Sequence, residues 1–149
     1  MGELEISSDP ARIDRDLVCE FLSRRAYWAL GRSRERIERS LAHSLVFGAY
    51  RDGRQLGFAR VVTDRATFAY LCDVFVIESA RGQGIGKRLM GAVCAHPDLQ
   101  GLRRFHLVTR DAHALYAQFG FTPLATPELH MERTELGAAA PGAAAPSDW

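Results

Sequence analysis

Apolar residues recur with two different spacings along this chain, and each spacing predicts one type of element. Alternating or short apolar runs predict strands over 3–8, 45–50, 55–63, 67–77 and 105–109. Apolar residues three or four apart predict helices over 14–26, over 33–43 with Ser33 as N-cap, and from Ile85 past Val93. Asp111 is expected to cap a short helix through Phe119, before strands over 121–124 and 129–133 close the sheet.

The order of these elements predicts one α/β domain with a mixed sheet. Asp52-Gly53 between the second and third strands is typical of a hairpin, and Asp64-Arg65-Ala66 turns the chain again. The strands over 45–77 therefore form an antiparallel meander. The strand over 67–77, the helix after it and the strand over 105–109 make a parallel pair with a right-handed crossover. We expect a mostly antiparallel sheet with this one parallel pair.

A glycine-rich turn joins the strand over 67–77 to its helix, in the order Arg81-Gly82-Gln83-Gly84-Ile85-Gly86. Glycines let the backbone turn tightly and approach a ligand, and the helix N-terminus behind them favours an anion. The turn is neither a nucleotide P-loop nor the dinucleotide fingerprint, because its glycines follow G-x-G-x-G. A phosphate-binding turn and a simple helix-starting turn both remain open on this hexapeptide alone.

Composition narrows the class of protein. The 149 residues suit one domain over 1–136, followed by an Ala/Pro/Gly-rich tail over 137–149 that is expected to be flexible. A net charge of +1 gives no reason to expect nucleic acid or a membrane surface as partner. An acidic start without an apolar run, and three scattered cysteines, favour a cytoplasmic protein. The five histidines show no metal-ligand spacing, so no metal site is expected.

Two motifs resemble the GCN5-related N-acetyltransferase (GNAT) superfamily, the R-x-x-G-x-G of the turn and A-H-A-L-Y-A-Q-F-G-F over 112–121. The resemblance spans about 3–133. It implies a sheet splayed between its fourth and fifth strands, and acetyl-CoA as cosubstrate. By the same resemblance the turn holds the pyrophosphate and the fourth strand pairs with the pantetheine arm; the residues concerned are Val74, Phe75, Val76, Arg81, Gly82, Gln83, Gly84, Ile85, Gly86 and Lys87.

Two residues are candidates for the chemistry. Tyr116 stands where the superfamily's motif has a tyrosine near the acetyl-CoA sulfur, which makes it the candidate acid for the departing thiolate. Asp73 is a carboxylate inside an otherwise apolar strand, where burial calls for a partner or a function. Three roles remain open for Asp73: a direct base, a base that acts through a water molecule, and a residue that holds the amine. Many members carry an asparagine where this chain has Thr109, so that cofactor contact is in doubt.

The acceptor side is predicted less sharply. In the superfamily the region around the first two helices shapes the acceptor site, which implies that Tyr27, Trp28 and Arg32, as well as Asp73, bind the acceptor. Core packing is the alternative for the aromatic pair. We expect transfer of the acetyl group to a primary amine of a small molecule, by direct attack in a ternary complex. A protein N-terminal or lysine acetyltransferase and a non-catalytic CoA-binding sensor are the alternatives. The oligomeric state is open, a homodimer included.

Overall fold

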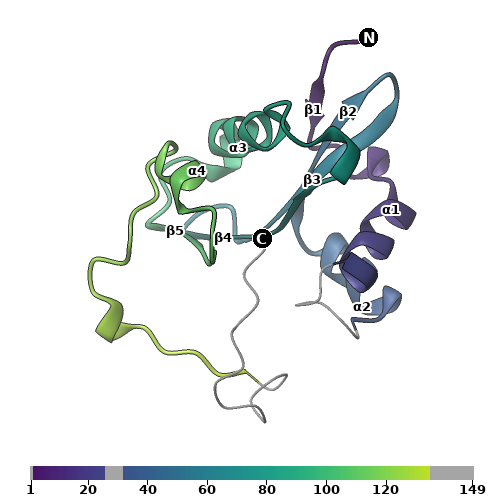
Figure 1. The fold of residues 1–149 in the computed structure, drawn as a ribbon. Helices are drawn as coiled ribbons and strands as arrows, with labels where there is room; N and C mark the ends of the chain where they lie inside the picture. The colour runs from purple at the N-terminus through teal and green to yellow at the C-terminus, as the bar shows by residue number, and fades with distance from the viewer. Residues whose placement is uncertain (1, 26–31, 135–149) are drawn as a thin grey trace.

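A five-stranded sheet in the order β1-β2-β3-β4-β5 organises the chain (Figure 1). The computed structural model describes residues 2–25 and 32–134. The strands are β1 (Glu5–Ser7), β2 (Leu45–Arg51), β3 (Arg54–Thr63), β4 (Phe68–Val76) and β5 (Arg104–Leu107). The pairs β1-β2, β2-β3 and β3-β4 are antiparallel, and the pair β4-β5 is parallel. The predicted meander and the predicted parallel pair are both confirmed.

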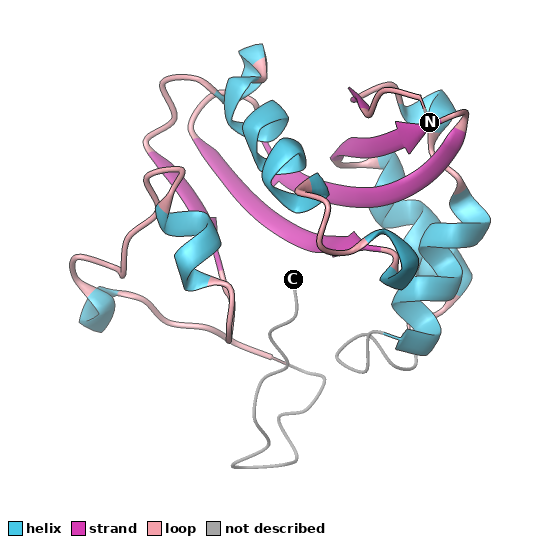
Figure 2. Cartoon of the chain, turned by 45° about the horizontal axis from the view of Figure 1, so that its top comes forward, coloured by secondary structure: helices cyan, strands magenta, loops and turns pink. Residues whose placement is uncertain are grey.

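Helices cover both faces of the sheet (Figure 2). They are α1 (Arg15–Glu20), α2 (Arg34–Ala42), α3 (Ile85–Ala95) and α4 (His113–Ala117), and a π-helical turn, Phe21–Arg25, extends α1. Neighbouring residues of β3 define the two faces. A Cβ on Gly57 would meet Leu89 of α3 at 3.0 Å, so that face packs on α3. The side chain of Phe58 points the other way, toward Phe75, which stacks on Phe21 with ring centroids 4.0 Å apart.

Local signals explain where the helices begin. The side chain of Asp14 accepts from the Leu17 N–H at 3.0 Å, and Ser33 accepts from the Arg36 N–H at 3.1 Å, so both act as N-caps. The expected cap at Asp111 is wrong. The turn into α4 is closed by Thr109, whose Oγ1 accepts from the Ala112 N–H at 3.1 Å.

The two strands predicted over 121–124 and 129–133 are also wrong. Neither segment pairs with a strand, and Pro127–Leu129 forms a single 3-10 turn. Pro123 and Pro127 lack the N–H that a ladder requires, which weakens strand formation here. We call residues 121–134 the arm. In Figure 1 it extends from α4 away from the helices that cover the sheet.

The sheet opens between β4 and β5. Paired residues run only from Phe68 opposite Arg104 to Leu71 opposite Leu107. Beyond Leu71, β4 continues through Val76 without a partner on this side, while β3 still pairs with its other edge. The splay expected from the resemblance is therefore present, and it exposes a strand edge just before the glycine turn.

Candidate functional site: a splayed strand, a glycine turn and a buried acid

The free edge of β4 presents backbone groups at alternate residues. The Ile77 N–H donates to the Leu56 carbonyl at 2.9 Å, which directs that residue toward β3. Alternation therefore turns the N–H and C=O groups of Val76, and of Val74 before it, toward the splay. The groups of Phe75 face β3. Of the three residues predicted to pair with pantetheine, two thus have their hydrogen-bonding groups on the open edge.

The glycine turn follows this edge directly and leads into α3. Gly82 and Gly84 have φ values of 79° and 78°, the left-handed region in which L side chains are strained. A Cβ added at Gly82, Gly84 or Gly86 would meet nothing within 4 Å. The protein's own packing therefore gives no reason for Gly86, whose φ is unexceptional, to lack a side chain. Open space above a helix N-terminus suits a phosphate.

Two arginines connect the turn to its surroundings. Arg81 Nε donates to the Val76 carbonyl at 3.2 Å, so the side chain lies back along the end of β4. Arg51 Nη1 donates to Gln83 Oε1 at 2.6 Å, which joins the turn to the hairpin between β2 and β3. Lys87, in the first turn of α3, is exposed and adds a positive charge at the same end. The predicted cofactor residues are therefore contiguous along β4, the turn and α3.

A β-bulge places Asp73 at the splay. Phe58 pairs with Phe75, and Arg60 pairs with Cys72, so Ala59 alone faces both Asp73 and Val74. Asp73 has a φ of 53°, a left-handed conformation that aspartate tolerates better than most residues. Bulges re-aim side chains. Here the bulge brings the carboxylate to the sheet face that carries the side chain of Arg60. Strict alternation along β4 would instead put the side chains of Asp73 and Cys72 on opposite faces of the sheet.

Asp73 is 1% exposed and forms a buried ion pair with two arginines. Its Oδ2 accepts from Arg60 Nε at 2.8 Å and from Arg32 Nη1 at 3.1 Å. Arg60 also donates to the Ser44 hydroxyl at 3.1 Å. Burial opposes the charged form of Arg60, but Asp73 and Cys72 outweigh it, so the pKa of Arg60 is raised. Two of the predicted acceptor-side residues, Arg32 and Asp73, are thus brought together.

The two carboxylate oxygens of Asp73 differ in their contacts. Oδ1 is buried and has no hydrogen-bond partner among residues 2–25 and 32–134. Buried carboxylate oxygens are normally satisfied, so this atom calls for a donor. Sequence reasoning missed Arg60, although a lone arginine in the apolar run L-G-F-A-R-V-V, one strand away from Asp73, is a recognisable signal.

Tyr116 lies on the other side of the splay, in α4, and is 2% exposed. Burial, with a smaller effect of Asp111, raises the pKa of Tyr116 to about 12. The residue lines a cavity of about 390 Å³ between β5 and α4, together with Thr109, His106 and His113. Thr109 uses its oxygen to close the turn into α4. The Thr109 hydroxyl is therefore already used in a contact within the fold.

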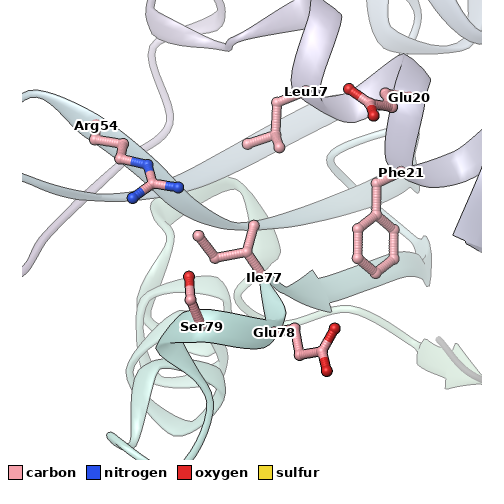
Figure 3. Close-up of a pocket in the computed structure, with 7 residues that line it drawn as sticks. All are labelled: Leu17, Glu20, Phe21, Arg54, Ile77, Glu78 and Ser79. Atoms are coloured by element: carbon pink, nitrogen blue, oxygen red, sulfur yellow. The ribbon is translucent and has the colours of Figure 1, made fainter.

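A different cavity, of about 530 Å³, lies between α1 and the end of β4 (Figure 3). None of the predicted site residues within the described ranges lines it. Figure 3 shows Glu20 and Phe21 on one side and Ile77, Glu78 and Ser79 on the other, with Arg54 of β3 at the rim. Tyr27 and Trp28, the predicted aromatic pair, lie outside the described residues, as does the tail over 137–149. Within the described ranges, no helix has the length and apolar character to cross a membrane.

Comparison with known proteins identifies the class that this fold and site define. The acetyltransferase (GNAT) domain family matches residues 42–123, which include the bulge, the glycine turn and Tyr116. The match covers more than half of the chain, which therefore belongs to the GNAT family of acetyltransferases.

Individual relatives agree with this assignment. A candidate acetyltransferase of Gibberella zeae is 29% identical over an alignment of 139 residues, and the match covers 78% of this chain and 77% of that protein. A candidate GNAT-family acetyltransferase from Xanthomonas campestris pv. campestris, known from a crystal structure, is 50% identical. Its TM-score is 0.88, over 94% of this chain and 99% of that one. A predicted acetyltransferase from Clostridium acetobutylicum, solved with acetyl-CoA, shares the fold at 14% identity, with a TM-score of 0.64 over 90% of this chain and 96% of that one.

Proposed function

We propose that the protein transfers the acetyl group of acetyl-CoA to a primary amine of a small molecule, by direct attack in a ternary complex. The observation that carries the proposal is the continuity of the free β4 edge with the open glycine turn at the N-terminus of α3. Pantetheine contains two amides that match a strand edge, and a pyrophosphate matches unpaired helix N–H groups. The three free cysteines support a cytoplasmic location.

In this proposal, different residues bind different parts of acetyl-CoA. Gly82, Gly84 and Gly86 leave the backbone of the turn open to the pyrophosphate, and Lys87 adds charge there. Val74 and Val76 offer backbone groups to the pantetheine arm. A backbone N–H on this edge would also stabilise negative charge that develops on the thioester oxygen. When bound, acetyl-CoA supplies an acetyl group activated as a thioester.

Asp73 Oδ1 is the feature that supports an amine acceptor. A protonated amine is the kind of donor that this buried oxygen requires, since it has no partner among the described residues. Oδ2 is already engaged by Arg32 and Arg60. Of the three roles open to Asp73, this arrangement supports the one in which Asp73 holds the amine. The proton that the ammonium loses before attack goes to water in this scheme.

Tyr116 completes the scheme on the sulfur side. The amine nitrogen bonds to the acetyl carbon, the C–S bond breaks, and the electron pair leaves on sulfur. With a pKa of about 12, Tyr116 keeps its proton at neutral pH and can donate a hydrogen bond to that sulfur. Full transfer to a thiolate of pKa near 8.5 is uphill by about 5 kcal/mol. Tyr116 therefore acts chiefly as a hydrogen-bond donor to the thiolate. The second proton leaves the nitrogen as the amide forms and passes through solvent water to the sulfur, which gives the free thiol.

The test combines a binding assay with a turnover assay. Acetyl-CoA is expected to raise the melting temperature of the parent protein, and Gly84→Asp to abolish that rise by placing a carboxylate where the pyrophosphate binds. Gly101→Asp is the matched control, because Gly101 also has a positive φ, of 66°, and open space around it. An undiminished rise in Gly84→Asp moves the cofactor site elsewhere.

Turnover is followed as release of free thiol across polyamines, aminoglycosides, amino acids and peptides. Release above the hydrolysis rate with small amines supports the proposal. Release with peptides alone identifies a protein acetyltransferase. Binding of acetyl-CoA without release for any amine identifies a CoA-binding sensor, and overturns the proposed transfer.

A further inference from the structure

The buried centre at the bulge carries more positive than negative charge. The side chains of Asp73, Arg60 and Arg32 meet there and are 0%, 14% and 21% exposed. Within the described ranges, Asp73 is the one carboxylate within ion-pair distance of either arginine. Two guanidinium groups thus share a single carboxylate. Because excess charge is costly to bury, this centre calls for a further anion.

Arg32 differs in this respect from the arginines of the neighbouring helix α2. Arg39, for example, pairs with Glu35 at 3.2 Å, and both side chains are more than half exposed. That pair has one charge of each sign, and water screens it. Arg32 instead shares its partner, Asp73, with Arg60, and all three side chains are mostly buried. The excess charge is therefore a property of the site and not of the arginine-rich segment as a whole.

The guanidinium group of Arg32 has donors left for an anion. A guanidinium group carries five N–H donors in a planar fork, which matches the geometry of a carboxylate. Among the described residues, Arg32 donates only to Asp73, from Nη1 to Oδ2 at 3.1 Å. Asp73 Oδ1 has no partner in the same ranges. An open acceptor oxygen and open donors thus lie on two sides of one carboxylate, an arrangement complementary to a molecule that carries both an ammonium and a carboxylate group.

We propose that the acceptor is a free amino acid, whose ammonium group binds to Asp73 Oδ1 and whose carboxylate binds to Arg32. This inference rests on the proposed function, because it concerns the acceptor of the same acetyl transfer. An α-amino acid carries both groups on one carbon, so they are close enough to contact Asp73 and Arg32 at the same time. Arg32 has the most exposed side chain of the centre, so its remaining donors are the ones that a dissolved carboxylate reaches first.

The excess charge also assists the chemistry of such an acceptor. Nearby positive charge favours the unprotonated form of an amine, which is the form that attacks the thioester. Once its ammonium proton has gone to water, the bound amino acid has a charge of −1 and balances the two arginines and Asp73. The C–N bond then forms, the C–S bond breaks, and the second proton passes through water from nitrogen to sulfur. The products are an N-acetyl amino acid and CoA with a free thiol.

The test compares matched acceptors in the assay of thiol release. The common amino acids with a primary amine are assayed first, and the best of them is compared with its carboxamide and with the amine that lacks the carboxyl group. We expect kcat/KM for the amino acid to be higher by about 10–10²-fold, the scale of one charge-assisted hydrogen bond. The carboxamide has the less basic amine and so more of the reactive form, which means that basicity alone favours the opposite ranking.

Arg32→Gln tests where the carboxylate binds. It is expected to raise KM for the amino acid by about 10-fold or more. KM for the carboxamide should stay unchanged, because Asp73 keeps Arg60 as its counter-ion. A merely structural defect would affect both acceptors alike, so the ratio of the two KM values separates binding from structure. Arg32→Lys should restore part of the preference. Arg39→Gln, which breaks an exposed pair on α2, is the matched control and should keep the parent ratio.

A binding measurement gives a second readout that does not depend on turnover. Calorimetric titration of the best amino acid into protein saturated with CoA should show binding that Arg32→Gln weakens and Arg39→Gln does not. An amine without a carboxylate that is acetylated as well as the best amino acid overturns the inference and leaves the proposed transfer intact. A KM ratio that Arg32→Gln does not change has the same consequence. Absence of thiol release with every amine overturns both.

Discussion

Arg60 and Asp73 meet at a bulge between β3 and β4, with Arg60 Nε 2.8 Å from Asp73 Oδ2. A charged pair in this position is costly to separate, because each member alone would be buried without its counter-ion. Arg32 adds a second cation to the same oxygen. The bulge thus brings one carboxylate against two guanidinium groups, and its Oδ1 has no partner in the described part of the chain.

Asp73→Asn is expected to lower the free energy of unfolding by about 3–5 kcal/mol, because Arg60 and Arg32 lose their buried counter-ion. Urea denaturation measures the loss. Adding Arg60→Met should restore part of it, since the double variant removes both charges. A single variant whose free energy of unfolding is within about 0.5 kcal/mol of the parent's contradicts a buried pair.

If Asp73 holds the amine, Asp73→Asn should also raise KM for the acceptor. Loss of the acidic limb of its pH–rate profile would point to a base instead.

Tyr116→Phe is expected to lower turnover by about 10²–10³-fold, the usual cost of removing one hydrogen-bond donor to charge that develops in the transition state. Acetyl-CoA affinity should be unchanged, since the ring and its packing volume remain. Tyr50→Phe is the control, because Tyr50 is also buried but its hydroxyl contacts the Arg12 carbonyl at 3.0 Å, outside the proposed site. Parent-like turnover of Tyr116→Phe assigns the hydroxyl a structural role only.

Cys72→Ala is expected to retain acetyl transfer. Burial raises the pKa of the Cys72 thiol to about 12, with Arg60 opposing and Asp73 adding to the shift, so almost no thiolate exists at neutral pH. Direct attack therefore does not need this sulfur. Mass spectrometry after a short treatment with iodoacetamide should find Cys94, which is partly exposed, modified before Cys72. Inactivation by the alanine substitution would instead indicate an acyl-enzyme route.

Stability near pH 6 is expected to depend on His106. Burial, then His130 and Arg104, lowers the pKa of His106 below its usual 6.5. The unfolded chain therefore takes up this proton first, and stability falls as pH decreases from about 6.5 toward the folded value. His106→Gln should flatten this part of the curve of melting temperature against pH. His43→Gln, at an exposed position, serves as control. Parallel curves for His106→Gln and the parent would rule out the contribution.

Removal of residues 137–149 is expected to leave the melting temperature and acetyl-CoA affinity nearly unchanged. This segment is rich in alanine, proline and glycine and has no apolar face to bury. Calorimetry on the chain ending at 136 measures both quantities. A melting temperature lower by several degrees would show that the tail packs on the domain.

Local signals predicted most of the fold and part of the site. The Asp52-Gly53 turn, the N-cap at Ser33 and the glycine turn each depend on neighbouring residues, so the sequence shows them directly. The bulge at Asp73 depends on register against β3, which no local pattern reveals. A strand was predicted over 129–133, but a strand also needs a partner edge, and pairing is not visible in a single segment.

Because of the bulge, the residues that form the β4 ladder are distinct from the residue that carries the carboxylate. Without residue 73, Val74 would face Ala59, while Cys72 and Phe75 would keep their present partners, Arg60 and Phe58. The strand is thus a complete, regular ladder with one extra residue, and that residue is the acid. A deletion of Asp73 combined with an apolar residue in place of Arg60 should therefore give a folded domain without the acidic centre. In such a chain the sheet, the glycine turn and the cofactor edge would all remain, and only the contribution of the inserted residue would be lost.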